Sequence, residues 1–214
     1  MRKLWPAFFA IVASVAFSLS MFNRLPERVV SHWGANGTPN GWMSRGAFVF
    51  GIHGLMIAVA VVLAFAPRIA PKRNNFEAHK GSYWLVANAA IILVAGITVI
   101  SFGVNLGWNF RIESLGYGVG LLIIIMGNVT TRVRPNWIFG LRTPWTLSSD
   151  KSWRKANRFA GYGFVLVGLA VVVVTAIRPA AMVWVVLIGS IAMSLAASLL
   201  SYIVWKNDPL ARHD

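Results

Sequence analysis

Long apolar stretches separated by short polar segments dominate the chain. Six of these stretches contain no Asp, Glu, Lys or Arg: residues 4–22, 46–66, 83–104, 114–131, 159–177 and 180–205. A helix rises about 1.5 Å per residue, so each stretch is long enough to cross a hydrocarbon layer of about 30 Å, tilted or straight. The pattern therefore predicts an all-α fold, a polytopic transmembrane helix bundle with six spans. The fourth span is the weakest, because Gly116, Gly118 and Gly120 crowd its start.

Composition agrees with a membrane protein. Hydrophobic residues make up 57% of the 214 residues and charged residues 12%, whereas soluble domains contain about 25% charged residues. The net charge of +14 would suggest nucleic acid in a soluble protein. Here the basic residues lie between the apolar stretches, where they are typical of signals that set the orientation of a chain in the membrane. We therefore expect no direct nucleic-acid partner. The absence of cysteine excludes disulfides and thiolate metal sites.

The distribution of Lys and Arg predicts the orientation. With the N-terminus in the cytoplasm, 15 of the 20 Lys and Arg residues fall on the cytoplasmic side. The other five lie outside: Arg24, Arg28, Arg45, Arg111 and Arg178. Because cytoplasmic loops carry the excess of positive charge, both termini are expected inside (N-in/C-in).

The sequence of the outside loop, residues 23–45, predicts an ordered segment. Asn36-Gly37 and Pro39-Asn40-Gly41 are turn signals, and residues 28–33 favour a short strand. Glu27 and His32 are candidates for a metal or acid–base site, but zinc needs three or four protein ligands. The alternatives are a packed loop with an exposed imidazole and a binding surface for an extracellular partner.

The second patterned segment is the motif loop, residues 132–158, on the cytoplasmic side. Pro135 and Pro144 exclude a continuous helix across it. Ser148 or Ser149 is suited to cap a short amphipathic helix that carries Trp153 on its apolar side and leads into the fifth span.

Tryptophans interleaved with arginines suit three tasks in this loop. The first is a juxtamembrane belt that attracts anionic lipid headgroups. The second is capture of a phosphate or carboxylate by Arg134 and Arg142 in fork geometry. The third is docking of a cytoplasmic protein. Composition alone leaves all three open.

Titratable residues inside the spans are scarce. All six acidic residues lie outside the spans or at their edges, which argues against a proton- or sodium-coupled transporter. His53 is expected to be a hydrogen-bonded packing group, and Asn88 and Asn128 are expected to bond across helices. The motif Gly103-x-x-x-Gly107 suggests close helix packing. Because no catalytic constellation lies at one membrane depth, we expect no enzyme activity, no cofactor and no metal.

The motif loop resembles the signature of a known family. It contains Asn136-x-x-x-Gly140-x-Arg142-Thr143-Pro144-Trp145-Thr146-Leu147-Ser148, followed by Trp153-Arg154-Lys155. This run is similar to the SdpI family, multipass bacterial membrane proteins named for immunity to a secreted peptide toxin, the sporulation-delaying protein. The outside loop, with Leu25-Pro26-x-x-Val29, His32-Trp33-Gly34 and Gly41-Trp42, resembles the N-terminal uncharacterised domain that commonly accompanies the family.

The resemblance implies a domain organisation. Residues 1–66 would form an N-terminal two-helix unit carrying the outside loop, and residues 67–214 a four-helix SdpI-like unit carrying the motif loop. Where family members often have Thr-His, this chain has Ala156-Asn157. That departure puts in doubt any mechanism that needs an imidazole there.

The resemblance also implies a function. The chain is expected in the bacterial inner (cytoplasmic) membrane, conferring resistance to a secreted peptide toxin and signalling by recruiting a cytoplasmic repressor. A transporter or lipid-handling protein that binds an anionic headgroup through the arginine-rich motif loop is the alternative. The expected partners are a peptide toxin, a repressor protein and membrane lipids. The candidate partner-binding residues are Pro26, His32, Trp33, Gly34 and Trp42 outside, and Arg134, Asn136, Gly140, Arg142, Thr143, Pro144, Trp145, Trp153 and Arg154 inside.

Overall fold

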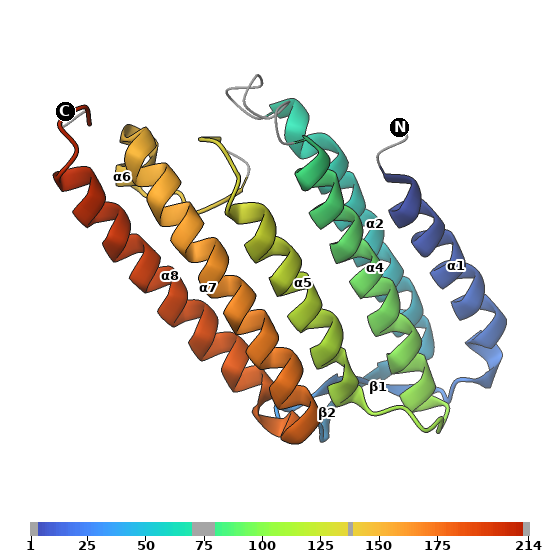
Figure 1. The fold of residues 1–214 in the computed structure, drawn as a ribbon. Coiled ribbons are helices and arrows are strands. Elements are labelled where there is room, and N and C mark those ends of the chain that lie inside the picture. The colour runs from blue at the N-terminus through green and yellow to red at the C-terminus, as the bar shows by residue number, and fades with distance from the viewer. Residues whose placement is uncertain (1–3, 70–79, 137–138, 212–214) are drawn as a thin grey trace.

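The computed structural model describes residues 4–69, 80–136 and 139–211. Six helices in these ranges are long and apolar enough to cross a membrane. They are α1 (Trp5–Met21), α2 (Arg45–Ile69), α4 (Lys80–Asn105), α5 (Leu115–Thr130), α7 (Asp150–Ile177) and α8 (Met182–Lys206). The predicted polytopic helix bundle is confirmed (Figure 1).

Short elements connect the long helices. They are η2 (Phe22–Arg24), β1 (Arg28–Trp33), β2 (Pro39–Ser44), η3 (Ile112–Ser114), α6 (Pro144–Ser148) and η4 (Pro179–Ala181). The strand expected at residues 28–33 is confirmed as β1, whereas β2 was not predicted because its sequence contains a proline and a glycine. Ser149 caps α7 as expected, and that helix continues without a break into the fifth span.

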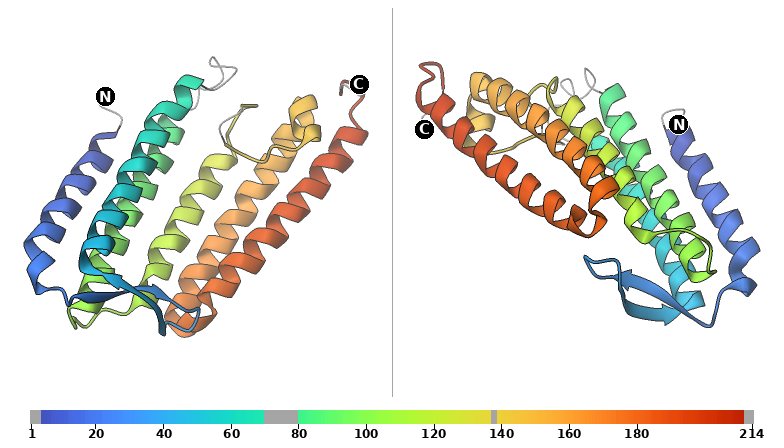
Figure 2. Two further views of the ribbon diagram at one scale, coloured as in Figure 1. Left: turned by 180° about the vertical axis from the view of Figure 1, so that it is seen from behind. Right: turned by 60° about the horizontal axis from the view of Figure 1, so that its bottom comes forward.

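Both described ends of the chain lie at one end of the bundle, together with α6 (Figure 1). The strands β1 and β2 and the turn between α7 and α8 lie at the opposite end, and Figure 2 shows the same arrangement from behind. Because six is an even number of spans, the two ends of the chain must lie at the same end of the bundle. Which end faces the cytoplasm stays a prediction from the distribution of Lys and Arg.

Helices α1, α2 and α4 pack together through two apolar clusters. Ala7 in the first turn of α1, Met56 of α2 and Ile91 of α4 form one of them. The amide of Asn88 on α4 also accepts a hydrogen bond from the backbone N–H of Ala7 (3.0 Å), so its predicted bond across helices is confirmed. Ala7 lies in the first turn of α1, where the helix itself provides no acceptor for its N–H.

His53 is a buried packing group in the same part of the bundle. Its Nδ1 lies 2.8 Å from the carbonyl oxygen of Val49 on the preceding turn of α2. Its Nε2 lies 3.2 Å and 3.4 Å from the hydroxyl oxygens of Ser14 and Ser18 on α1. The ring therefore joins α1 to α2 with all its hydrogen-bonding atoms in use, as expected.

Glycines bring α5 and α7 into backbone contact. A Cβ on Gly120 would lie 2.9 Å from the carbonyl oxygen of Gly168, and one on Gly127 would lie 2.7 Å from that of Gly161. Helices in lipid associate by close packing of small residues. Gly120, one of the glycines that make the fourth span look weak, therefore helps to hold α5 against α7, whereas a Cβ on Gly118 would meet Leu93 of α4.

Two packing expectations are wrong. A Cβ on Gly103 would meet the rings of Phe110 and Trp108 from the following loop, and Gly107 lies beyond the end of α4 with a φ of 72° and nothing near its Cβ position, so neither glycine brings α4 against another helix backbone. The amide oxygen of Asn128 accepts from Arg132 (2.6 Å), four residues along the same segment, and not from another helix.

The proposed division after residue 66 remains a prediction. In the structure α4, on the C-terminal side of that boundary, packs against α1 and α2 and also against α5.

Candidate functional site

The outside loop forms a β-hairpin, residues 28–44, in which β1 and β2 pair antiparallel. The turn closes where the N–H of Gly34 donates to the carbonyl of Thr38 (2.8 Å). Gly37 has a φ of 76°, which L side chains rarely adopt. Gly41 is also required by sterics, because a Cβ there would lie 2.9 Å from the Cβ of His32 on the paired strand.

The base of the hairpin is anchored in the bundle. Val29 is fully buried in a cluster with Leu25, Phe48, Val49 and Phe102.

The side chain of Asn105, at the end of α4, pairs with the backbone of Val30. It accepts from the Val30 N–H (2.7 Å) and donates to the Val30 carbonyl (3.0 Å). Asn105 thus makes the hydrogen bonds that a neighbouring strand would make. These bonds fix the position of β1 relative to the end of α4.

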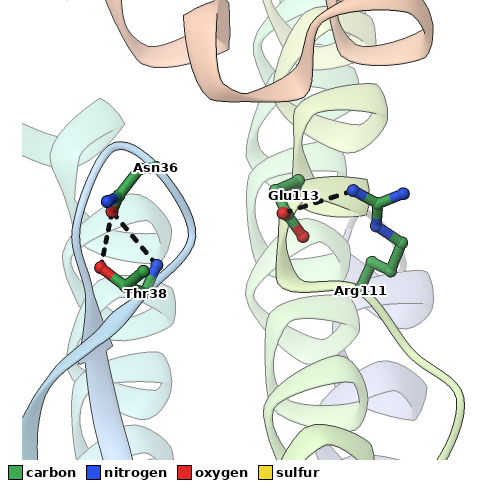
Figure 3. Close-up of polar contacts among 4 residues, drawn as sticks. All are labelled: Asn36, Thr38, Arg111 and Glu113. Carbon is green, nitrogen blue, oxygen red and sulfur yellow. Dashed lines mark hydrogen bonds and ion pairs between the residues drawn. The ribbon is translucent and has the colours of Figure 1, made fainter.

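The tip of the hairpin lies beside the start of α5. Figure 3 shows the hydrogen bonds between Asn36 and Thr38 inside the turn and the ion pair between Arg111 and Glu113 near the start of α5. A Cβ on Gly37 would lie 2.8 Å from the carboxylate of Glu113, and that carboxylate is 3.6 Å from the guanidinium of Arg111. The hairpin therefore spans from α1 and α2 to the second half of the bundle.

The remaining hairpin side chains form an exposed surface. Trp42 is 52% exposed, and the neighbouring Met43 is 38% exposed. His32 and Pro26 are exposed as well, whereas Trp33 and Gly34 are half-buried. The imidazole Nδ1 of His32 pairs with the amide oxygen of Asn40. Among the described residues, no group of three His, Asp or Glu side chains lies close enough to hold a metal ion.

The motif loop is built on α7 through two buried side chains. Trp153 is fully buried, and its indole N–H donates to the carbonyl of Val133 (2.7 Å). One turn further, the amide of Asn157 accepts from the N–H of Leu141 (2.6 Å) and donates to the Leu141 carbonyl (3.3 Å). These contacts fix the backbone that follows α5 and the backbone that precedes α6.

Asn136 and Gly140 shape the loop between those two points. Asn136 is buried, and its side chain accepts from the N–H of Phe139 (3.0 Å) and donates to the carbonyl of Arg134 (2.9 Å). Gly140 has a φ of 104°, and a Cβ there would lie 2.7 Å from the amide oxygen of Asn157. Glycine is required at that position for both reasons.

Thr143 starts α6 and ties it to α8. It forms a capping box with Thr146, and Pro144 occupies the first helical turn, where its missing N–H is not needed. The hydroxyl of Thr143 also lies 3.0 Å from that of Ser201 on α8.

A polar network at the start of α7 was not predicted. Ser149 caps the helix and donates to the carboxylate of Asp208, and Ser152 donates to the carbonyl of Ser201 (2.7 Å). Ser201 lies in the last turns of α8, and Asp208 follows that helix. Apart from the polar side chains of these two residues, no sequence pattern indicated these contacts.

The exposed part of the motif loop is its cationic and aromatic surface. Arg134, Arg142, Arg154 and Pro144 are exposed. Trp145 packs edge-on against Tyr202 of α8, with ring centroids 5.1 Å apart. The candidate residues of this loop thus divide into an internal frame (Asn136, Gly140, Thr143 and Trp153) and an outer surface (Arg134, Arg142, Pro144, Trp145 and Arg154).

Comparison with known proteins matches both patterned regions. Residues 132–204 match the SdpI/YfhL protein family, and residues 9–57 match a domain of unknown function (DUF1648). Immunity protein SdpI of Bacillus subtilis (strain 168) is 25% identical over 207 residues, which cover 96% of this chain and 97% of that protein. No solved structure matches. The resemblance to the SdpI family that the two loops indicated is confirmed.

Proposed function

We propose, from its SdpI-family region and its likeness to an immunity protein, that this chain protects a bacterial cell from a secreted peptide toxin. The single observation that carries the proposal is similarity along nearly the whole chain, 96% of it, to Immunity protein SdpI. In this proposal the protein acts by binding, at the bacterial cytoplasmic membrane, with one patterned surface at each end of the bundle.

The hairpin is the proposed contact for the toxin. Trp42 offers exposed apolar surface on β2, while Val29 and Asn105 hold the strands in place. A rigid aromatic anchor on an ordered scaffold loses little conformational freedom on binding. This supports the hairpin as a docking surface for a hydrophobic peptide.

The outer surface of the motif loop is the proposed contact for a cytoplasmic repressor. Arg142 is exposed next to the capped start of α6, and Trp145 packs beside it on Tyr202. Arginine and tryptophan are enriched where proteins dock. Because the frame residues fix the backbone of this loop, the exposed side chains are displayed on a defined surface.

Immunity is tested by expressing the chain in Bacillus subtilis cells that lack their own immunity protein and adding the toxin. We expect survival with the unaltered chain and reduced survival with Trp42→Ala. The matched control is Trp184→Ala, which removes an equally exposed tryptophan (57%) from the start of α8, at the same end of the bundle. Absence of protection by the unaltered chain, at wild-type membrane levels, contradicts the proposal.

Recruitment is tested separately in the same cells. Where a small repressor is encoded beside the chain's gene, its tagged form should move to the membrane fraction when toxin is added, and Arg142→Gln should leave it in the cytosol. Lys206→Gln, at the same end of the bundle but outside the motif loop, is the control. A repressor that stays cytosolic with the unaltered chain contradicts the recruitment step and leaves immunity to be judged by survival.

A further inference from the structure

A cavity lined by arginines opens at the motif-loop end of the bundle, between the end of α5 and the start of α7. Its volume is about 360 Å³. Arg132 and Arg134 line it from the segment after α5, and Arg154 and Arg158 line it from α7. Asn157, whose side chain fixes Leu141, lies in the same lining.

The residues that line the cavity carry an excess of positive charge. Four of them are arginines and one, Asp150, is acidic, so the formal excess is three positive charges. Arg154 and Arg158 are four residues apart on one helix face, where like charges repel each other. A bound anion would relieve that repulsion.

Two of the guanidinium groups are held in position by neighbours. Arg132 donates to the amide oxygen of Asn128 (2.6 Å). Arg158 lies 3.4 Å from the hydroxyl of Tyr162 and 5.8 Å from the centre of its ring. Side chains that are already ordered lose less entropy when they bind a ligand. Arg132 and Arg158 are thus partly ordered before a ligand binds.

The chemistry of the lining selects the ligand. Guanidinium groups bind phosphate oxygens in pairs, with two parallel N–H donors each. A cavity of about 360 Å³ is at the lower end of the range for small-molecule sites, about 300–1,000 Å³. It is suited to a small phosphate-bearing group.

The position of the cavity favours a lipid as the source of that phosphate. Helix α5 has 16 residues, against 26 in α4 and 28 in α7. It stops short of both neighbours at this end of the bundle (Figures 1 and 2). The cavity at the end of α5 therefore lies at the end of the bundle, where lipid headgroups would meet a protein that spans the membrane.

An apolar cavity of about 280 Å³ lies at the same end of α5, lined among others by Leu63, Val86, Met126 and Phe139. Thr130 lines this second cavity and Thr131 the cationic one, so the two are adjacent along the chain. An acyl chain is the natural occupant of such a surface in a bilayer.

We propose that the arginine-lined cavity binds the phosphate of an anionic phospholipid. Such a site would anchor the motif loop to the inner leaflet, and it does not depend on the immunity function. It differs from general attraction of basic residues to an anionic surface, which needs neither a recess nor the fork geometry of arginine.

The test is native mass spectrometry of the full chain purified in detergent, titrated with dioleoyl phosphatidylglycerol and, in a second arm, with inorganic phosphate. We expect saturable binding of one lipid. Loss of one charge-assisted contact in Arg154→Gln or Arg158→Gln should weaken it by about tenfold. The matched control is Lys155→Gln, which removes the same charge from an exposed position on α7 that does not line the cavity.

Arg154→Lys separates a built site from diffuse attraction, because it keeps the charge and removes the fork. Weakened lipid binding in Arg154→Lys supports the proposal. Equal weakening in Lys155→Gln, or unchanged binding in both Arg154 variants, overturns it. Inorganic phosphate that competes with the lipid at equal affinity keeps the phosphate site but overturns the lipid as its source.

Discussion

Asn157 is the residue on which the conformation of the motif loop depends. It is 1% exposed and joins α7 to both backbone groups of Leu141. The side-chain amide of Asn157 donates and accepts at once, so one residue satisfies both of these backbone groups. In this chain the position supports the loop backbone and offers no proton to a partner.

Asn157→Ala should destabilise the protein by about 1–3 kcal/mol. It leaves the part-buried N–H of Leu141 without this acceptor and removes one of the donors to the Leu141 carbonyl, which keeps its bond from Thr146. Thermal unfolding of the purified protein in detergent measures the change. Asn23→Ala, at an exposed position in η2, is the control and should leave the melting temperature unchanged. Equal melting temperatures for both variants would contradict the role assigned to Asn157.

At the scale of elements, the position of the β-hairpin depends on the end of helix α4. Two hydrogen bonds from Asn105 take the place of a third strand, and Val29 inserts below them. An isolated two-stranded hairpin is marginally stable in water, so these anchors decide whether the exposed surface around Trp42 is ordered.

Asn105→Ala should loosen the hairpin and leave the helices intact. Hydrogen–deuterium exchange of the amides in residues 28–44 should become faster, because local opening no longer breaks the bonds to Val30. The amides of α7, far from the hairpin anchor in the chain, serve as the internal control. Unchanged exchange in residues 28–44 would show that Val29 and its neighbours hold the hairpin without Asn105.

The contact between α5 and α7 depends on the absence of side chains. Gly120→Ala should destabilise the bundle by about 1–3 kcal/mol, because the added methyl group meets the backbone at Gly168, which has no room to move. Unfolding of the purified protein in increasing SDS measures this.

The matched control is Gly96→Ala, in the middle of α4, where an added Cβ meets nothing within 4 Å. Alanine has the higher helix propensity, by about 1 kcal/mol, so this variant should be neutral or stabilised. If Gly120→Ala behaved like Gly96→Ala, the two helices would not be packed through their backbones.

At the scale of the whole molecule, the sequence predicted the number and order of the spans because lipid leaves the backbone few options. Hydrogen bonds must be satisfied within each segment, so apolar length alone reveals a helix. The strand at residues 28–33 and the helix cap at Ser149 were also predicted from the sequence, since strand preference and capping are local properties.

Contacts between distant segments could not be predicted in the same way. Which glycines pack against another helix depends on the partner's position, so Gly103 was assigned wrongly and Gly120 was taken as a weakness. The arginine-lined cavity likewise combines residues from two elements, and Arg132 and Arg158 were not recognised as part of a site. The motif residues Asn136 and Gly140 were identified by type, but their role in shaping the loop required coordinates.

Both proposed contacts require that the hairpin faces outward and that the motif loop faces the cytoplasm. The two lie at opposite ends of the bundle (Figure 1), so fixing the side of one fixes the other. The chain has no cysteine, which makes single-cysteine variants clean reporters. Thr38→Cys lies at the hairpin turn and Asn207→Cys at the end of α8, both exposed.

The decisive measurement is labelling of these two variants in spheroplasts with a membrane-impermeant maleimide. We predict that Thr38→Cys is labelled while the membrane is intact, and that Asn207→Cys is labelled only after the membrane is permeabilised. Labelling of Asn207→Cys in intact spheroplasts, with Thr38→Cys protected, would contradict the orientation. The toxin-facing role of the hairpin would be excluded with it.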